Sequence, residues 1–251
     1  SESRNWVCNK TILCGDIDMN GDTMNNSYHV VTTTNVSEET LIDGFCITGG
    51  NANGISIPTF SGGGWYNVGS GVGHRSNPSI VNVIISGNYA AAGGGIYNDG
   101  YLGECLPHLI NVTISGNNAG TRGGGMFNYS LTSGTSSPKL TNVLIIGNIA
   151  GINGGGITNY GFNGGTSSPI LTNVVLSGNK ATMQGGAMEN FGTGGTTNPT
   201  MTNCIFWNNA ANTDSIISES NSTTTITYSI LQSGSLDALT DISDPSNKPQ
   251  G

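Results

Sequence analysis

The segment from residue 16 to residue 22 has a spacing of oxygen-bearing side chains that suits a hard cation. Asp16, Asp18, Asn20 and Asp22 alternate with other residues, and Gly21 lies among them. These four residues match positions 1, 3, 5 and 7 of a calcium-binding loop. The twelfth position is Ser27 instead of a bidentate Glu. Two interpretations stay open: a calcium site that stabilises the N-terminal turns, or a solvated acidic turn held by side-chain hydrogen bonds.

A second group of residues could perform acid–base chemistry. Asp99, Tyr101 and Glu104 share one loop, and His74 and Arg75 lie in the loop one period earlier. Cleavage of a polysaccharide needs two or three carboxylates at one bond, or carboxylates that hold calcium beside an Arg or Lys base. The chain has three arginines, and its remaining carboxylates are scattered. We therefore assign no catalytic residue, favour solvated loop charges, and keep a divergent polysaccharide lyase or glycoside hydrolase as the alternative.

The cysteines give no metal-binding pattern. They are Cys8, Cys14, Cys46, Cys105 and Cys204, an odd number without a CxxC pair. Cys8 and Cys14 could pair in an oxidising compartment. Cys204 falls in a column of valines and is expected in the core, whereas Cys105 lies in a loop and could be free or paired with a partner.

Aromatic residues recur next to a glycine-rich segment and form the candidate ligand-binding set. These residues are Tyr97, Tyr101, Phe127, Tyr129, Tyr160, Phe162 and Phe191, with Trp65 and Tyr66 one period earlier. Some should point into the core. Those that point outward would form a strip suited to sugar rings or to a protein partner. The expected partners are a cell-surface glycan, a cell-surface protein or further copies of this chain.

A repeat with a period of about 30 residues must position all of these side chains. Each copy reads Pro-x-hydrophobic-x-Asn-hydrophobic-x-hydrophobic-x-Gly-Asn, followed by Gly-Gly-Gly-hydrophobic-x-Asn. The copies begin at Pro78, Pro107, Pro138 and Pro169, and a degraded copy begins at Pro199. A fixed period of this size indicates a repeat architecture.

The residues within each period predict short strands. Segments such as Val83–Ser86 and Val112–Ser115 are β-branched and end at Gly-Asn. Helical repeats of similar length need many charged residues, but only 9% of this chain is charged and 40 of its residues are glycine. We predict an all-β, right-handed parallel β-helix (β-solenoid) with about 30 residues per coil and about 4.8 Å between turns. The expected division is an N-terminal cap and first strand at 1–27, coils at 28–232 and an irregular tail at 233–251.

The two-residue period of a strand separates inward from outward positions. One inward column holds Val83, Val112, Val143, Val174 and Cys204, and a second holds Ile85, Ile114, Ile145, Leu176 and Phe206. The opposite phase includes Leu144, Ile146, Ile205 and Trp207, an apolar outward face. Asn also recurs in three columns, which predicts hydrogen-bonded ladders between turns and left-handed backbone at a corner. Glycine triplets predict a second, sharper corner.

The repeat resembles a known class of surface proteins. Gly94-Gly-Ile-Tyr-Asn98, the variant Gly185-Gly-Ala-Met-Glu-Asn190 and Phe206-Trp-Asn-Asn209 look like the GGA[ILV] and FxxN repeats of polymorphic outer-membrane-protein-type proteins. The segment Leu41–Asn53 is similar to the opening of secreted bacterial parallel β-helix proteins. The resemblance implies a bacterial surface protein, often with an adhesive role, and implies no set of catalytic residues.

The composition agrees with a location outside the cell. The formal net charge is −8, with only seven Lys and Arg, so the basic footprint of a nucleic-acid-binding protein is missing. The sequence contains no run of 18 apolar residues, so it predicts no membrane-spanning helix. The chain begins at Ser1 rather than Met, which we interpret as a processed product or a fragment. The predicted function is a structural, adhesive or assembly-forming role without catalysis.

Overall fold

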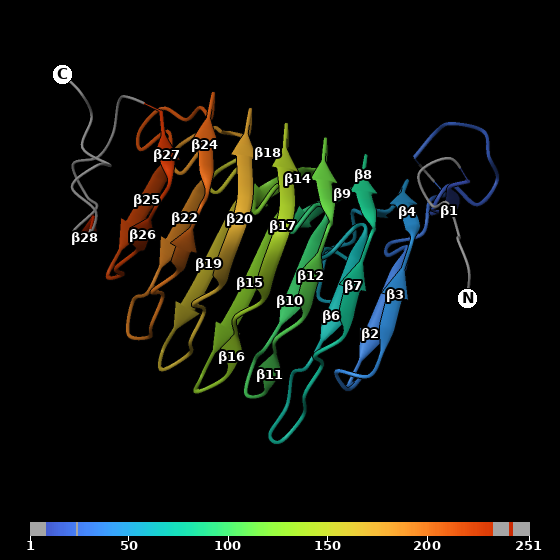
Figure 1. Cartoon of the computed structure of the whole chain (residues 1–251). Coiled ribbons are helices and arrows are strands. Elements are labelled where there is room, and N and C mark those ends of the chain that lie inside the picture. Colours follow the sequence, from blue (N-terminus) through green and yellow to red (C-terminus); the bar gives the residue numbers. More distant parts are fainter. Residues whose placement is uncertain (1–8, 24, 233–240, 243–251) are drawn as a thin grey trace.

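The chain forms a parallel β-solenoid of about seven turns, with equivalent residues roughly 31 positions apart. The computed structural model describes residues 9–23, 25–232 and 241–242, and these contain strands and no helix. Figure 1 shows the turns following one another along the stack from the N-terminal to the C-terminal side. Ile96, Met126, Ile157 and Met188 illustrate the register, each paired in parallel with the next. The predicted fold class is confirmed.

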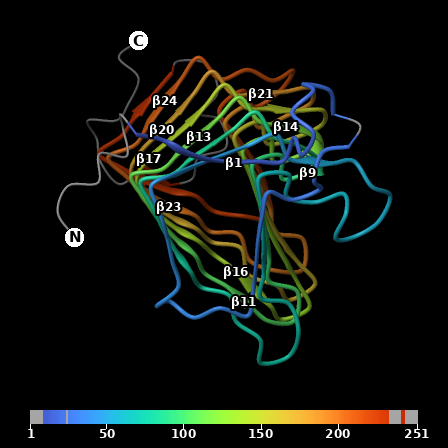
Figure 2. The same ribbon diagram turned by 90° about the vertical axis from the view of Figure 1, so that its right-hand side faces the viewer.

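Successive turns overlay one another when the stack is viewed along its length, so the strands form long sheets around one interior (Figure 2). The largest sheet, called the long sheet below, has 14 strands. Its strands are β1 (Thr11–Cys14), β3 (Leu41–Asp43), β4 (Phe45–Thr48), β7 (Ser79–Val81), β8 (Ile84–Ser86), β12 (His108–Ile110), β13 (Thr113–Ser115), β17 (Lys139–Ile146), β20 (Ile170–Ser177), β23 (Thr200–Thr202), β24 (Ile205–Trp207), β26 (Thr225–Thr227), β27 (Ile230–Leu231) and β28 (Asp241–Ile242).

Three smaller sheets run beside the long sheet. A five-stranded sheet contains β5 (Asn51–Ala52), β9 (Tyr89–Ala92), β14 (Asn118–Arg122), β18 (Ile149–Ala150) and β21 (Lys180–Ala181). The seven-stranded sheet follows it in each turn, with β2 (Val31–Thr34), β6 (Trp65–Val68), β10 (Ile96–Asp99), β15 (Met126–Leu131), β19 (Ile157–Phe162), β22 (Met188–Phe191) and β25 (Ile217–Ser220). A short sheet pairs β11 (Glu104–Cys105) with β16 (Thr135–Ser136).

The core includes both columns that the strand alternation predicts, together with further buried columns such as Ile80, Leu109, Leu140 and Leu171. The two predicted inward columns, from Val83 to Cys204 and from Ile85 to Phe206, are at most 1% exposed. Residues of the opposite phase face solvent, and Trp207 is 59% exposed. The buried apolar side chains form one core that runs along the whole stack. Each turn contributes to it by packing its inward side chains against those of the previous turn.

All three asparagine ladders are present. In the buried ladder of the seven-stranded sheet, the Asn98 amide donates to Asn128 Oδ1 at 2.8 Å, and Asn128 donates to Asn159 at 2.8 Å. A second buried ladder runs through Asn117 and Asn148. The third is exposed and has the predicted left-handed backbone, with φ of 54° at Asn82, 56° at Asn111, 56° at Asn142, 57° at Asn173 and 55° at Asn203.

The glycine triplets form the second corner, between the five-stranded and seven-stranded sheets. The first glycine of each triplet has positive φ, as at Gly123 (67°). The second allows close approach of stacked backbones, since a Cβ on Gly94 would lie 2.4 Å from the Asn118 carbonyl oxygen. This corner fixes where the strands of the seven-stranded sheet begin, and therefore which of their residues point outward.

The ends of the stack are described in part. β1 pairs in parallel with β4, and β28 pairs in parallel with β26, so both belong to the long sheet. Most of the predicted tail at 233–251 and residues 1–8 of the predicted cap lie outside the described residues, and the domain limits stay predictions. Within the described part of the chain, no helix has the length and apolar character needed to cross a membrane.

Candidate binding groove

The outward side of the seven-stranded sheet carries seven of the 17 Phe, Tyr and Trp residues of the chain. Because side chains alternate along a strand, Ile96 and Asn98 of β10 point inward while Tyr97 and Asp99 point outward. The parallel register then places Tyr66, Tyr97, Phe127, Thr158 and Glu189 in one outward row, and Val68, Asp99, Tyr129, Tyr160 and Phe191 in the next. We call this surface the aromatic face.

The rings of the aromatic face form one connected cluster. His29 stacks on Tyr66 at a centroid distance of 5.0 Å, and Tyr66 contacts Tyr97 at 5.6 Å. Phe127 stands almost perpendicular to Tyr97 and to Tyr160, at 81° and 89°. The cluster continues through Tyr129, Tyr160, Phe162 and Phe191.

The second row is a ring stack that is open to solvent at its edges. Tyr160 and Phe191 are nearly parallel, at 10°, with centroids 4.9 Å apart, and Tyr129 lies 5.8 Å from Tyr160. Rings this close must overlap in part, because rings lying side by side in one plane would collide. The stack therefore presents ring edges more than ring faces. All three residues are partly exposed.

A groove of about 450 Å³ lies on this face. Tyr97, Phe127, Tyr129 and Tyr160 line its floor. Ile57 and Phe60 of the loop before β6, together with Thr121, Arg122 and Ile152 at the edge of the five-stranded sheet, also line it. Tyr97 and Phe127 are buried, whereas Phe60 and Ile152 are partly exposed. A concave, mostly apolar surface with a few polar groups is the usual form of a small-ligand site.

Arg122 and Glu189 form an ion pair beside the groove. Arg122 Nε lies 3.5 Å from Glu189 Oε2, and the guanidinium lies over the Tyr160 and Phe191 rings at 5.8 and 5.9 Å. The Glu189 side chain is 2% exposed and also accepts hydrogen bonds from Asn153 at 2.6 Å and Thr158 at 3.2 Å. Burial raises the pKa of Glu189, and the Arg122 charge opposes that shift.

Asp99 is the second buried carboxyl of the aromatic face. The Tyr66 hydroxyl donates to Asp99 Oδ2 at 3.1 Å, and the Tyr101 backbone N–H donates to Oδ1 at 3.1 Å. Burial raises the pKa of Asp99, partly offset by these hydrogen bonds. Desolvation, followed by the nearby Asp99 charge, also raises the pKa values of Tyr66 and Tyr97.

The structure separates the two carboxylates of the proposed catalytic patch. Asp99 belongs to the aromatic face, whereas Glu104 forms an ion pair with Arg75 at 3.7 Å and accepts from the Asn77 amide at 2.7 Å. Asp99 ends β10 and Glu104 begins β11, and the turn between them points their side chains to different neighbours. Asp99 and Glu104, which the sequence placed in one candidate patch, therefore lie in two separate environments.

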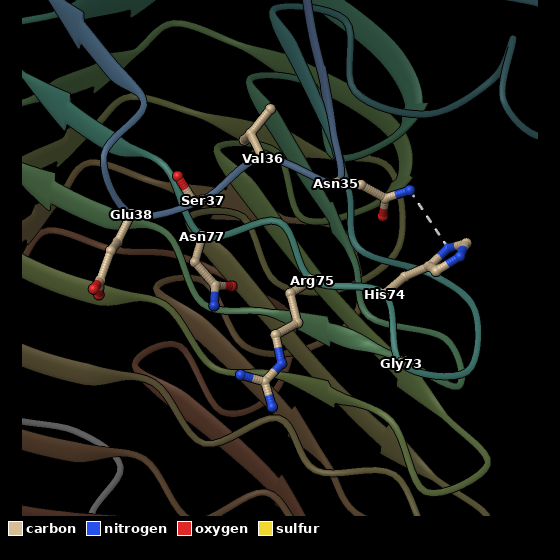
Figure 3. A pocket seen from close by; sticks show the side chains of 8 residues that line it. All are labelled: Asn35, Val36, Ser37, Glu38, Gly73, His74, Arg75 and Asn77. Carbon is tan, nitrogen blue, oxygen red and sulfur yellow. Dashed lines mark hydrogen bonds between the residues drawn. The ribbon is translucent and has the colours of Figure 1, made fainter.

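Arg75 and His74 line a different pocket, of about 520 Å³ (Figure 3). In Figure 3 they extend away from each other, and Glu38 lies on the opposite side from His74. His74 Nδ1 contacts the Ser70 carbonyl oxygen at 2.8 Å and the Asn35 amide at 3.5 Å. The Arg75 side chain is 72% exposed. A side chain this exposed makes a weak platform for chemistry, because water competes with the contacts that would hold it in one geometry.

Six of the seven predicted ligand-binding residues lie in the aromatic cluster. Tyr101 is 39% exposed and has no ring contact with the cluster among the described residues. Trp65 points inward and packs in the core. The prediction missed Phe60, Ile57 and Arg122, which shape the groove. A weak signal for Arg122 was present, because it is one of three arginines in the chain.

The four residues of the predicted calcium loop lie near one another and are joined by hydrogen bonds. The Asn20 amide donates to Asp18 Oδ2 and to Asp22 Oδ2, both at 3.0 Å, and the Gly21 N–H donates to Asp16 Oδ2 at 3.1 Å. A hydrogen bond from the Asn25 amide is the main cause that lowers the pKa of Asp18. These hydrogen bonds are those of the second interpretation, an acidic turn held by its own side chains. Calcium binding at these residues stays a prediction.

The cysteines divide by burial. Cys105 and Cys204 are buried in the interior, while Cys14 is exposed. Burial raises the pKa of both interior thiols. Cys105 is therefore not placed to pair with an outside partner, contrary to one of the two options that its loop position suggested. The predicted pairing of Cys14 with Cys8 lies outside the described residues.

No family model matches the sequence, and searches of curated proteins and of solved structures likewise find no significant match.

Proposed function

We propose that this chain is an extracellular or bacterial cell-surface β-solenoid that binds carbohydrate without cleaving it, in an adhesive role. The observation that carries the proposal is the groove on the aromatic face, which is lined by five aromatic residues, three of them partly exposed. The composition, which has few charged residues and a net negative charge, supports an extracellular location. The resemblance to bacterial surface repeats supports an adhesive role.

Carbohydrate fits this groove because a sugar combines apolar C–H surfaces with hydroxyl groups. Aromatic rings such as Tyr97 and Phe127 bury the apolar surface of a ligand. The hydroxyls of Tyr129 and Tyr160 can both donate and accept hydrogen bonds, as sugar hydroxyls do. A cell-surface protein or a second copy of this chain remains the competing partner, and a binding test separates them.

The positions of the buried carboxylates argue against the enzymatic alternative on this face. Asp99 and Glu189 lie three turns apart in the register, which corresponds to about 14 Å at about 4.8 Å per turn. Two carboxylates that cleave one glycosidic bond are about 5 to 9.5 Å apart. Glu189 is also fully engaged by Arg122, Asn153 and Thr158. Neither carboxylate is placed to act with the other on one sugar bond.

The test is incubation of the protein with a panel of neutral and acidic polysaccharides, measuring binding and the release of reducing ends separately. We expect saturable binding without cleavage. Tyr160→Ala should abolish most of the binding because it removes the centre of the ring stack. Trp207→Ala is the matched control, since Trp207 is an exposed aromatic residue on the long sheet, away from the groove.

Three results would contradict the proposal. Absence of binding to every polysaccharide would remove carbohydrate as the partner. Equal loss of binding in both variants would place the site elsewhere. Cleavage that disappears in Asp99→Asn or Glu104→Gln would restore the enzymatic alternative.

A further inference from the structure

The charged side chain that lines the groove is already ion-paired before any ligand binds. Arg122 is the one charged residue among those that line the groove, and its charge is balanced by Glu189 at 3.5 Å. Because the Glu189 carboxylate is buried and held by two further donors, it cannot turn away to release Arg122. The pair is neutral as a unit, so it offers no free positive charge to a carboxylate or sulfate group on a ligand.

The remaining charge near the aromatic face is negative. Asp99 lies one turn before Tyr129 in the same outward row. The whole chain carries a formal net charge of −8, which repels polyanions over distances up to about 10 Å at moderate salt. A uronic-acid or sulfated polymer would therefore approach an unfavourable field and find no unpaired cation in the groove.

We propose that the groove selects a neutral glycan, and that the Arg122–Glu189 pair is the specificity-determining element that excludes acidic polysaccharides. This inference rests on the proposed carbohydrate-binding function and adds the substrate class. Arg122, whose side chain is 34% exposed, contributes a flat surface over Tyr160 and Phe191 and hydrogen-bond donors for sugar hydroxyls. Glu189 acts through Arg122, as a positioning residue.

The experiment compares a neutral polymer, galactomannan, with an acidic one, polygalacturonate, at low and moderate salt. We expect the unmodified protein to bind galactomannan with less than about a twofold change between the two salt concentrations, because no ion pair forms with the ligand. Polygalacturonate should bind at least about tenfold more weakly.

Two variants test the role of the ion pair. Glu189→Gln leaves Arg122 as an unpaired cation, so binding to polygalacturonate should rise several-fold and become salt-sensitive. The double variant Arg122→Gln with Glu189→Gln removes both charges, so polygalacturonate should again be excluded and its binding should lose the salt sensitivity of Glu189→Gln, whereas galactomannan binding should weaken because the Arg122 contacts with the sugar are lost. Far-ultraviolet circular dichroism and thermal melting confirm that each variant is folded.

The outcomes separate this inference from the proposed function. Tighter, salt-sensitive binding of polygalacturonate by the unmodified protein would overturn neutral selectivity and leave the carbohydrate-binding function intact. An unchanged preference in folded Glu189→Gln would overturn the role of the ion pair. Failure to bind any polysaccharide would overturn both the inference and the function on which it rests.

Discussion

The two faces of the seven-stranded sheet share one backbone, but the inward face repeats one residue type over five successive turns and the outward face does not. Its inward side repeats Asn at Asn67, Asn98, Asn128, Asn159 and Asn190, each fully buried and bonded to the next turn. Its outward side changes at every turn, from Tyr66 and Tyr97 to Phe127, Thr158 and Glu189. A ladder needs an identical partner above and below, whereas a binding surface needs a specific shape at one place. The difference between the faces therefore separates stability from recognition.

The largest effect should come from breaking the inward ladder. Asn128→Ala leaves the Asn98 amide without its acceptor and Asn159 Oδ1 without its donor, both in the interior. Each unsatisfied buried group costs about 1–3 kcal/mol, so the free energy of unfolding should fall by about 2–6 kcal/mol. Denaturant unfolding followed by circular dichroism measures this loss.

The exposed ladder provides the matched control. Asn142→Gly removes an amide that bonds to the same kind of neighbours and keeps a residue that tolerates φ of 56°. Water replaces the lost bonds there, so the cost should stay below about 1 kcal/mol. Equal costs at the two positions would show that burial does not distinguish the ladders.

The next effect should come from Glu189, a charged outward residue that is almost as buried as the ladder. Glu189→Ala removes the acceptor of Asn153 and Thr158 and the partner of Arg122, and should cost about 1–3 kcal/mol. Glu189→Gln keeps an acceptor and should cost less. If Glu189→Ala were as stable as the unmodified protein, this part of the outward face would not contribute to stability as its contacts indicate.

Asp99 should give the outward face a pH dependence that the inward ladder lacks. Its folded pKa is raised above the ordinary value of 3.8, so the folded protein keeps this proton to higher pH than the unfolded chain. The resulting stabilisation is complete below pH 3.8 and is lost as the pH rises through the folded pKa. Subtracting the melting temperatures of Asp99→Asn from those of the unmodified protein, pH by pH, isolates this term. A flat difference would contradict the raised pKa.

The sequence alone predicted the parts of this comparison that repeat. Val83 and Ile85 fall into inward columns because strand alternation and the 30-residue period both constrain them. The outward ion pair escaped prediction because Arg122 and Glu189 occur once each, two turns apart, and meet through side-chain reach. The closeness of Asp99 and Glu104 in the sequence placed them in one candidate patch. The turn between β10 and β11 sends them to different neighbours, a direction that residue types do not encode.

The smallest effect on stability should accompany the clearest effect on recognition. Replacing Tyr129 and Tyr160 together by Phe keeps both rings in the stack and removes only two hydroxyls from partly exposed positions. The free energy of unfolding should change by less than about 1 kcal/mol, because a hydroxyl on a partly exposed residue contributes little to stability. Galactomannan binding should nevertheless fall about tenfold, since the double variant loses two groups that can hydrogen-bond to sugar hydroxyls. Titration calorimetry and thermal melting of the same samples measure the two quantities together. Unchanged affinity in the double variant would mean that the ligand contacts only the rings, and the outward face would then recognise apolar surface without the hydrogen bonds that its tyrosines offer.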